Sequence, residues 1–179
     1  SAQSFGFAFD RHAARNELQA ATFRLAIPSW VRLLLSKSGA FAIETSPLPP
    51  PPSGAVEVAV VPLPVRTSDF RLRHKTSDRA FYDDARAASG VFEVVFTDPD
   101  GMLTEGSFTN GFVERDGLLL TPPAERGLLP GVLRQSLIDS GGAIEAPLVP
   151  ADLTGGFLIG NALRGLVPAM VAPQQRPRL

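Results

Sequence analysis

The chain has 179 residues, a formal net charge of −1 and 44% hydrophobic residues, a composition typical of folded proteins. Its 17 basic and 18 acidic residues exclude the positive surface that nucleic-acid binding needs, and the absence of Cys excludes disulfides and cysteine-bound metal clusters. No apolar run approaches the ~20 residues of a membrane span, and the N-terminus lacks a signal-peptide pattern. We therefore expect a soluble, cytoplasmic protein with neither nucleic-acid nor membrane partners.

The first 47 residues predict a helix followed by a β-hairpin. Asp10 is a typical N-cap residue, and apolar residues at helical spacing follow it over residues 11–21. Residues 30–35 and 41–45 flank the turn sequence SKSG, a pattern typical of a hairpin.

Residues 48–54 contain four consecutive prolines, which cannot enter the interior of a helix or sheet. This composition favours a stiff polyproline II linker, and the alternative is a ligand for a proline-binding domain. The linker would separate a small N-terminal domain, residues 1–47, from a larger domain, residues 55–172, and a tail, residues 173–179.

The larger domain is predicted to be rich in β-structure, with two helices. Helical spacing covers residues 76–88, and Pro130 suits the first turn of a helix that runs to about Ser140. Strand patterns cover the remaining apolar segments, residues 56–61, 91–97, 102–114, 118–120, 143–149 and 157–171.

Lys75 is one of only two lysines among the 17 basic residues. Unlike arginine, a lysine flanked by cations can lose its proton and attack a carbonyl as a Schiff-base nucleophile. Arg73, His74 and Arg79 supply such neighbours, and the alternative is a solvated basic patch before a helix.

Glu105 lies in TEGSFTN, residues 104–110, beside a glycine that permits close backbone approach. A carboxylate there could hold a cofactor's pyridine nitrogen protonated, whereas the alternative is a surface residue on a strand. In GLLPGVLR, residues 127–134, a helix start with free N–H groups could hold a phosphate. In GNALRG, residues 160–165, polar side chains lie between two apolar strands.

Other catalytic patterns are missing from the sequence. His12 and His74 have no clustered partners, so we expect no metal site. The chain also lacks the G-x-S-x-G elbow, the dinucleotide-binding G-x-G-x-x-G after a strand and the Walker A pattern.

Taken in order, Lys75 before a helix, TEGSFTN, a hairpin ending in TPP, GLLPGVLRQ and GNALRGLVPA resemble the class IV pyridoxal-phosphate aminotransferase family. That family includes branched-chain and D-amino-acid aminotransferases and 4-amino-4-deoxychorismate lyase. The resemblance covers about residues 58–171. It implies an α+β, two-domain fold with a truncated small α/β domain and a larger barrel-like β domain, assembled as a homodimer.

The resemblance also implies roles for individual residues. Lys75 would form the Schiff base with pyridoxal 5′-phosphate (PLP) and shuttle the proton, and Glu105 would face the pyridine nitrogen. The backbone at Val132 and Leu133, and Asn161 with Ala162, would bind the phosphate. Arg79 and Arg164 are further candidates for contacting substrate or phosphate.

Three departures accompany the resemblance. Asp78 stands where lyase relatives usually carry Asn, and Gly111 replaces a branched residue. The family's phosphate-binding arginine lies upstream of the matched segment, and this sequence starts too late to include it, so we expect weak cofactor binding.

The dipeptide Asn161–Ala162 is similar to the lyase branch. It predicts conversion of 4-amino-4-deoxychorismate to 4-aminobenzoate and pyruvate, a step of folate biosynthesis. The alternatives are a transaminase of the branched-chain or D-amino-acid type and a catalytically silent dimeric relative.

Overall fold

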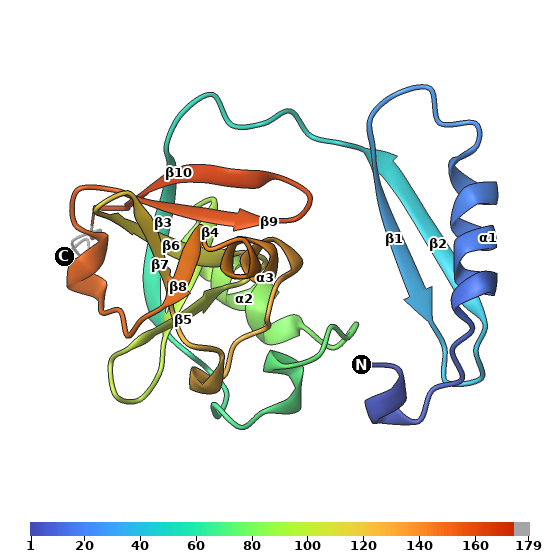
Figure 1. Ribbon diagram of the computed structural model, residues 1–179, viewed down its shortest axis with the longest axis horizontal. Helices are drawn as coiled ribbons and strands as arrows, with labels where there is room; N and C mark the ends of the chain where they lie inside the picture. The colour runs from blue at the N-terminus through green and yellow to red at the C-terminus, as the bar shows by residue number, and fades with distance from the viewer. Residues whose placement is uncertain (174–179) are drawn as a thin grey trace. The chain divides into compact units, whose positions relative to one another are not determined.

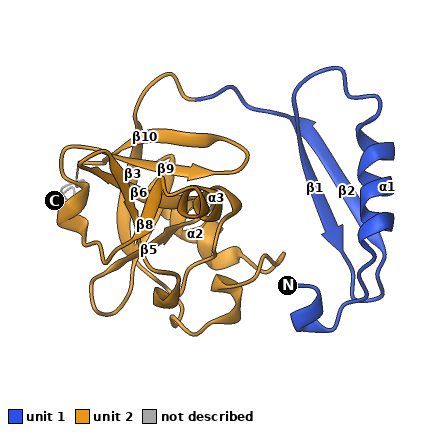
Figure 2. Ribbon diagram, in the orientation of Figure 1, with its two compact units in different colours: residues 1–51 blue, residues 52–179 orange. Residues whose placement is uncertain are grey.

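The computed structural model describes residues 1–173 and divides the chain into two compact units, residues 1–51 and 52–179 (Figure 2). The boundary between the units falls inside the proline-rich segment predicted as a linker. Apart from Pro173, the predicted tail lies outside the described residues. Each unit is described separately below.

Unit 1 consists of a helix and a two-stranded antiparallel hairpin. Helix α1 (Arg11–Thr22) begins where the Asp10 carboxylate accepts the N–H groups of His12 at 2.7 Å and Ala13 at 3.2 Å. Strands β1 (Ser29–Leu35) and β2 (Phe41–Pro47) pair in register from Ser29↔Pro47 to Leu35↔Phe41. The predicted helix and hairpin are therefore confirmed.

Unit 2 is built on one mixed sheet of eight strands in the order β5-β4-β3-β10-β9-β6-β7-β8 (Figure 1). Crossover connections join the strands of the parallel pairs β3–β4 and β7–β8, and they contain helices α2 and α3 respectively. The elements are β3 (Val56–Pro62), α2 (Ala80–Ser89), β4 (Glu93–Thr97), β5 (Leu103–Gly106), β6 (Asn110–Arg115), β7 (Leu118–Thr121), α3 (Val132–Asp139), β8 (Ala143–Glu145), β9 (Phe157–Asn161) and β10 (Gly165–Val171). Short 3-10 turns lie at η2 (Phe70–Leu72), η3 (Ala124–Arg126) and η4 (Pro150–Leu153), and at η1 (Gln3–Phe5) in unit 1.

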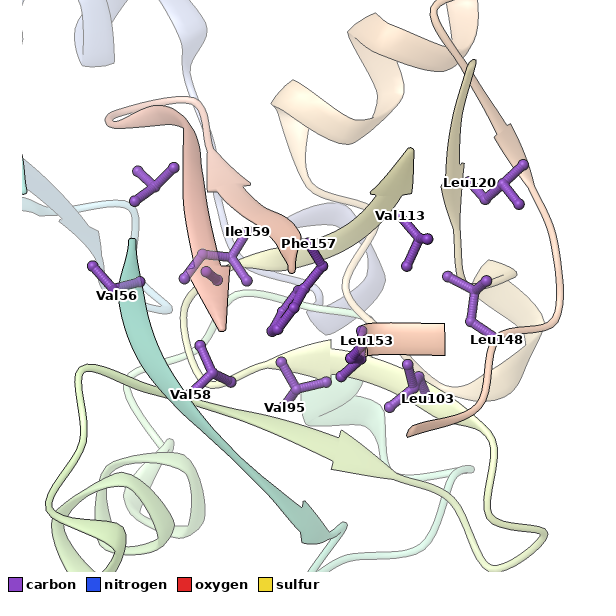
Figure 3. Packing of buried hydrophobic residues seen from close by; sticks show 12 residues of the cluster. Val56, Val58, Val95, Leu103, Val113, Leu120, Leu148, Leu153, Phe157 and Ile159 are labelled. Carbon is purple, nitrogen blue, oxygen red and sulfur yellow. The ribbon is translucent and has the colours of Figure 1, made fainter. Parts of the chain in front are cut away.

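Two apolar clusters cover the two faces of the central strands. One fills the concave side of the curved sheet, where the side chains of Val58, Val95 and Ile159 meet (Figure 3). The other lies between the opposite face and α2, and joins Tyr82 to Val94 and Phe96. Because successive strand residues point to opposite faces, Val94 and Val95 serve different clusters. The chain is an α+β protein, as the sequence predicted.

The predicted starts of the two helices of unit 2 were wrong. Helix α2 begins at Ala80, because Arg79 is not helical (φ −137°, ψ 19°) and the Thr76 hydroxyl donates to the Asp78 carbonyl in a turn. Helix α3 begins at Val132, because Gly131 is extended (φ −64°, ψ 148°) and acts as the N-cap. Pro130 therefore precedes the helix instead of lying in its first turn.

Two strand predictions were also wrong in extent. The segment 102–114 forms two strands, β5 and β6, because the buried Glu93 carboxylate binds the loop 107–109 between them. Only residues 143–145 of the segment 143–149 pair as a strand. No described helix is long and apolar enough to cross a membrane.

Candidate active site

Glu105 lies near the end of β5 and is only 4% exposed. Its carboxyl accepts hydrogen bonds from the Tyr82 hydroxyl on α2 and from the Leu129 N–H at 3.0 Å. Burial raises the pKa of Glu105 to about 8, because removal from water disfavours the charged form more than these two donors stabilise it. A cation placed against this carboxyl would therefore lower its pKa and form an ion pair with it.

The loop that follows Glu105 contacts two of the predicted site residues. The Arg79 guanidinium donates to the Ser107 carbonyl at 2.7 Å and lies 5.5 Å from the centre of the Tyr82 ring. The Asn161 side-chain amide donates to the Phe108 carbonyl at 3.1 Å. Residues 105–108 thus join Glu105, Arg79 and Asn161 in one network.

The Asn161 side chain also shapes the turn between β9 and β10. Its carbonyl oxygen accepts the N–H groups of Leu163 and Arg164, both at 3.0 Å. The turn places Ala162 in solvent, and the Arg164 guanidinium lies 5.9 Å from the centre of the Phe92 ring.

The start of α3 meets the same network through Asn110. The Asn110 amide donates to the Leu129 carbonyl at 3.1 Å, and a Cβ added to Gly131 would lie 2.2 Å from the Asn110 Oδ1 atom. The first N–H groups of α3, including those of Val132 and Leu133, have no intrahelical partner, as at the start of any helix, and no side chain of the N-cap residue caps them. A Leu133 methyl group packs against Gly160, immediately before Asn161.

Lys75 lies on the segment between η2 and α2, and its side chain is exposed. Within the described part of the chain, its amine makes no hydrogen bond or ion pair. The segment is held from both sides, since Arg71 binds Asp78 at 3.2 Å and Arg79 binds Ser107. Asp78, where lyase relatives carry Asn, is therefore paired with a cation.

Sequence reasoning missed three residues of this site. Tyr82, the single tyrosine of the chain, binds Glu105, and Glu93 binds the loop after Glu105. Arg134, 1% exposed, donates from α3 to the Pro122 carbonyl at 2.7 Å and to Glu145, and this hydrogen bond lowers the pKa of Glu145. A signal existed for Glu93, which is a lone charge within the apolar run of residues 91–96.

The residues present fit a phosphorylated pyridine cofactor. The uncapped α3 start suits a phosphate, because its first N–H groups are free to donate to an anion. The buried Glu105 carboxyl suits a ring N–H, which would be a cation when protonated. Among residues 1–173, no three His, Asp or Glu side chains are close enough to hold a metal ion.

Comparison with known families gives one match that spans nearly the whole chain. The family described as Amino-transferase class IV matches residues 1–170. A Thermotoga maritima protein assigned as a branched-chain-amino-acid aminotransferase is 33% identical over 57 residues. That segment is 32% of this chain and spans only 21% of the relative.

Solved structures share the fold. A Mesorhizobium loti protein assigned as an amino-acid aminotransferase is 34% identical, with a TM-score of 0.89 over 96% of this chain and 86% of that chain. A protein assigned as a 4-amino-4-deoxychorismate lyase is 24% identical, with a TM-score of 0.75 over 97% of this chain and 75% of that chain. At that identity, the second likeness concerns the fold alone.

Proposed function

Because the chain belongs to the class IV aminotransferase family, which is PLP-dependent, we propose that it is a 4-amino-4-deoxychorismate lyase. The reaction would release 4-aminobenzoate and pyruvate from a small-molecule amino substrate. The observation that carries the proposal is the network joining Glu105 through its loop to Arg79 and Asn161.

In this proposal, bound PLP supplies an electron sink for the carbon next to the substrate nitrogen. Lys75 would hold the cofactor until the substrate amine replaces it, and its freed Nζ would then remove the proton from the ring carbon. The same Nζ would deliver a proton to the methylene carbon of the leaving enolpyruvyl group. The exposed position of Lys75 leaves its amine accessible to a small ligand.

Glu105 would accept the ring N–H and keep it protonated. Its pKa of about 8 would fall beside a pyridinium cation, because an opposite charge favours the ionised carboxylate. The Tyr82 hydroxyl and the Leu129 N–H already fix the orientation of this carboxyl.

The phosphate would lie against the N–H groups of Val132 and Leu133 and the turn at Asn161 and Ala162. Arg79 and Arg164 remain the candidates for binding a carboxylate of the substrate. Both guanidinium groups are partly exposed, so they can reach a ligand without a buried charge being left unpaired.

Two observations bear on the choice between lyase and transaminase, and they favour different activities. Asn161, which is similar to the residue of the lyase branch, makes three side-chain hydrogen bonds, two within its turn and one to the Phe108 carbonyl. Its residue type therefore matters to both loops. The 34% identity to a protein assigned as an amino-acid aminotransferase favours the alternative, a transaminase. We infer the lyase from Asn161 because that residue lies in the network itself.

We further propose that the enzyme acts as a homodimer in the cytoplasm, within folate biosynthesis. Large exposed apolar side chains, such as Val132 at 74% and Phe23 at 83% exposure, would be covered by assembly.

The first experiment tests cofactor attachment. Purified protein incubated with PLP is expected to absorb visible light, and borohydride reduction with peptide mapping should place the label on Lys75. A Lys75→Arg variant is the matched control, since it keeps the charge but cannot form a Schiff base. A label on Lys37 would exclude this assignment, and the absence of any visible band would exclude it and favour the silent relative.

The second experiment tests the reaction type. Incubation with 4-amino-4-deoxychorismate should release pyruvate without an added keto acid. If turnover instead requires an amino donor together with a keto-acid acceptor, the transaminase alternative replaces the lyase.

A further inference from the structure

A second buried carboxylate, Glu93, lies beside Glu105 without a role in the proposed chemistry. We propose that Glu93 is a positioning residue, whose carboxylate folds residues 107–109 into the loop that holds Arg79 and Asn161. This inference rests on the proposed function only where it concerns the cofactor.

Glu93 begins β4 and is 0% exposed. Its Oε1 accepts the N–H groups of Val94 at 2.9 Å and Ser107 at 3.0 Å, together with the Ser107 hydroxyl. Its Oε2 accepts the Phe108 N–H at 3.1 Å and the Thr109 hydroxyl at 2.9 Å. Four of these five donors come from three consecutive loop residues, so one carboxylate fixes the course of the loop.

The backbone carbonyls of the same loop accept hydrogen bonds from residues of the candidate site. With the N–H groups of Ser107 and Phe108 bound to Glu93, the carbonyl of Ser107 accepts from Arg79 and that of Phe108 accepts from Asn161. A planar peptide group couples the direction of each N–H to the direction of the preceding carbonyl. Loss of the Phe108 N–H bond would therefore also release the Ser107 carbonyl that Arg79 binds.

Gly106 makes this approach possible. A Cβ at Gly106 would lie 2.8 Å from the Glu93 Oε2 atom and 2.5 Å from the Thr109 hydroxyl oxygen. The close approach of the Glu93 carboxylate to the loop thus requires a glycine after Glu105.

A glutamine cannot replace Glu93 in this role. Each carboxylate oxygen accepts at least one backbone N–H, which can only donate, so either orientation of a glutamine amide would face its NH₂ group toward a donor. The favoured orientation places the NH₂ group at the position of Oε2, because one backbone N–H donates there, whereas two donate to Oε1. The Phe108 N–H would then lose its partner.

The test compares Glu93→Gln with wild type and with Glu57→Gln, which neutralises an exposed glutamate on β3. Without cofactor, hydrogen exchange of the Phe108 N–H and the NMR signal of the Asn161 side-chain amide are measured. Absorbance titration then gives the PLP affinity. Glu93→Gln should exchange Phe108 at least about tenfold faster and weaken PLP binding about tenfold, as expected for a lost hydrogen bond to a charged group. Glu57→Gln should match wild type in both measurements.

Unchanged Phe108 exchange and an unchanged Asn161 signal in Glu93→Gln would overturn the inference, whatever the cofactor does. Faster exchange with wild-type PLP affinity would overturn the link to the cofactor site. If wild type itself binds no PLP, the proposed function fails, while the exchange measurement still decides the role of Glu93. Should Glu93→Gln not fold, Glu93→Asp keeps the charge but shortens the side chain and withdraws it from the Phe108 N–H, and wild-type exchange at Phe108 in that variant would overturn the inference.

Discussion

At the scale of single residues, the site depends on two carboxyl groups whose pKa values burial has changed. Glu105 and Glu93 are both nearly inaccessible to water, and burial raises the pKa of each. Glu93 accepts hydrogen bonds from five donors, whereas Glu105 accepts from two, and its pKa is raised to about 8. Near neutral pH and without cofactor, Glu105 is therefore largely protonated, and it is the carboxyl that a cationic ligand would ionise.

The variant Glu105→Gln mimics this protonated acid. Its amide oxygen can accept the Leu129 N–H, and its NH₂ group can donate to the Tyr82 oxygen. In wild type the folded pKa, about 8, exceeds the ordinary value of 4.5, so stability is lost as the pH rises from 4.5 through 8. Urea unfolding of cofactor-free protein should show wild type losing a few kcal/mol relative to the variant across this window, at roughly 1.4 kcal/mol per pKa unit.

Below pH 4.5 the two proteins should show the same pH dependence, since the carboxyl is then neutral in both the folded and the unfolded states. Parallel stability curves from pH 4 to pH 9 would contradict the raised pKa. With PLP present, Glu105→Gln should slow turnover while Lys75 still reacts with the cofactor, because only the contact to the ring nitrogen is weakened.

At the scale of elements, α3 is placed by contacts at both of its ends. Its start is fixed by Gly131 against Asn110, and its body by the buried Arg134, which binds the Pro122 carbonyl and Glu145. Its end is closed by Gly141, whose positive φ of 74° glycine adopts without strain. An eight-residue helix is too short to be stable alone, so these tertiary contacts determine where its free N–H groups point.

The substitution Gly131→Ala should move the start of α3. Its Cβ would overlap the Oδ1 of Asn110, which is only 6% exposed, so the helix or the asparagine must shift. We expect a loss of about 1–3 kcal/mol in the free energy of unfolding, which is typical of overpacking. We also expect the variant to bind PLP more weakly than wild type does. Pyridoxal without its phosphate should bind both proteins equally, because only the phosphate contact is disturbed.

Gly111→Ala is the matched control, since a Cβ there would meet no atom within 4 Å. It should leave cofactor affinity unchanged. If Gly131→Ala also binds PLP like wild type, the start of α3 is not the phosphate site.

At the scale of the whole molecule, the two units differ sharply in their cores. In residues 1–51 the one buried hydrophobic side chain is Ala14, whereas unit 2 contains both apolar clusters. Hydrophobic burial is the dominant favourable contribution to folding, so unit 1 by itself is the weaker of the two.

The chain carries a spectroscopic reporter in each unit. Its single Trp, Trp30, lies on β1, and its single Tyr, Tyr82, lies on α2. Urea should change Trp30 fluorescence at lower concentrations than it changes Tyr82 fluorescence, the latter measured in a Trp30→Phe variant. Coincident transitions would show that the units unfold as one cooperative body.

The sequence by itself determined the elements whose causes are local. The Asp10 cap and the hairpin around SKSG each depend on residues only a few positions apart. The order of motifs also indicated the family, because each motif is readable without the fold.

Only the tertiary structure decided which polar residues work together. Tyr82 meets Glu105 across 23 positions, Glu93 meets Ser107 across 14, and Asn161 meets Phe108 across 53. No local pattern specifies such pairs, because they follow from strand register and crossover connections. The raised pKa of Glu105 and the shifted starts of α2 and α3 have the same origin, since burial and long-range hydrogen bonds exist only once the sheet has brought distant segments together.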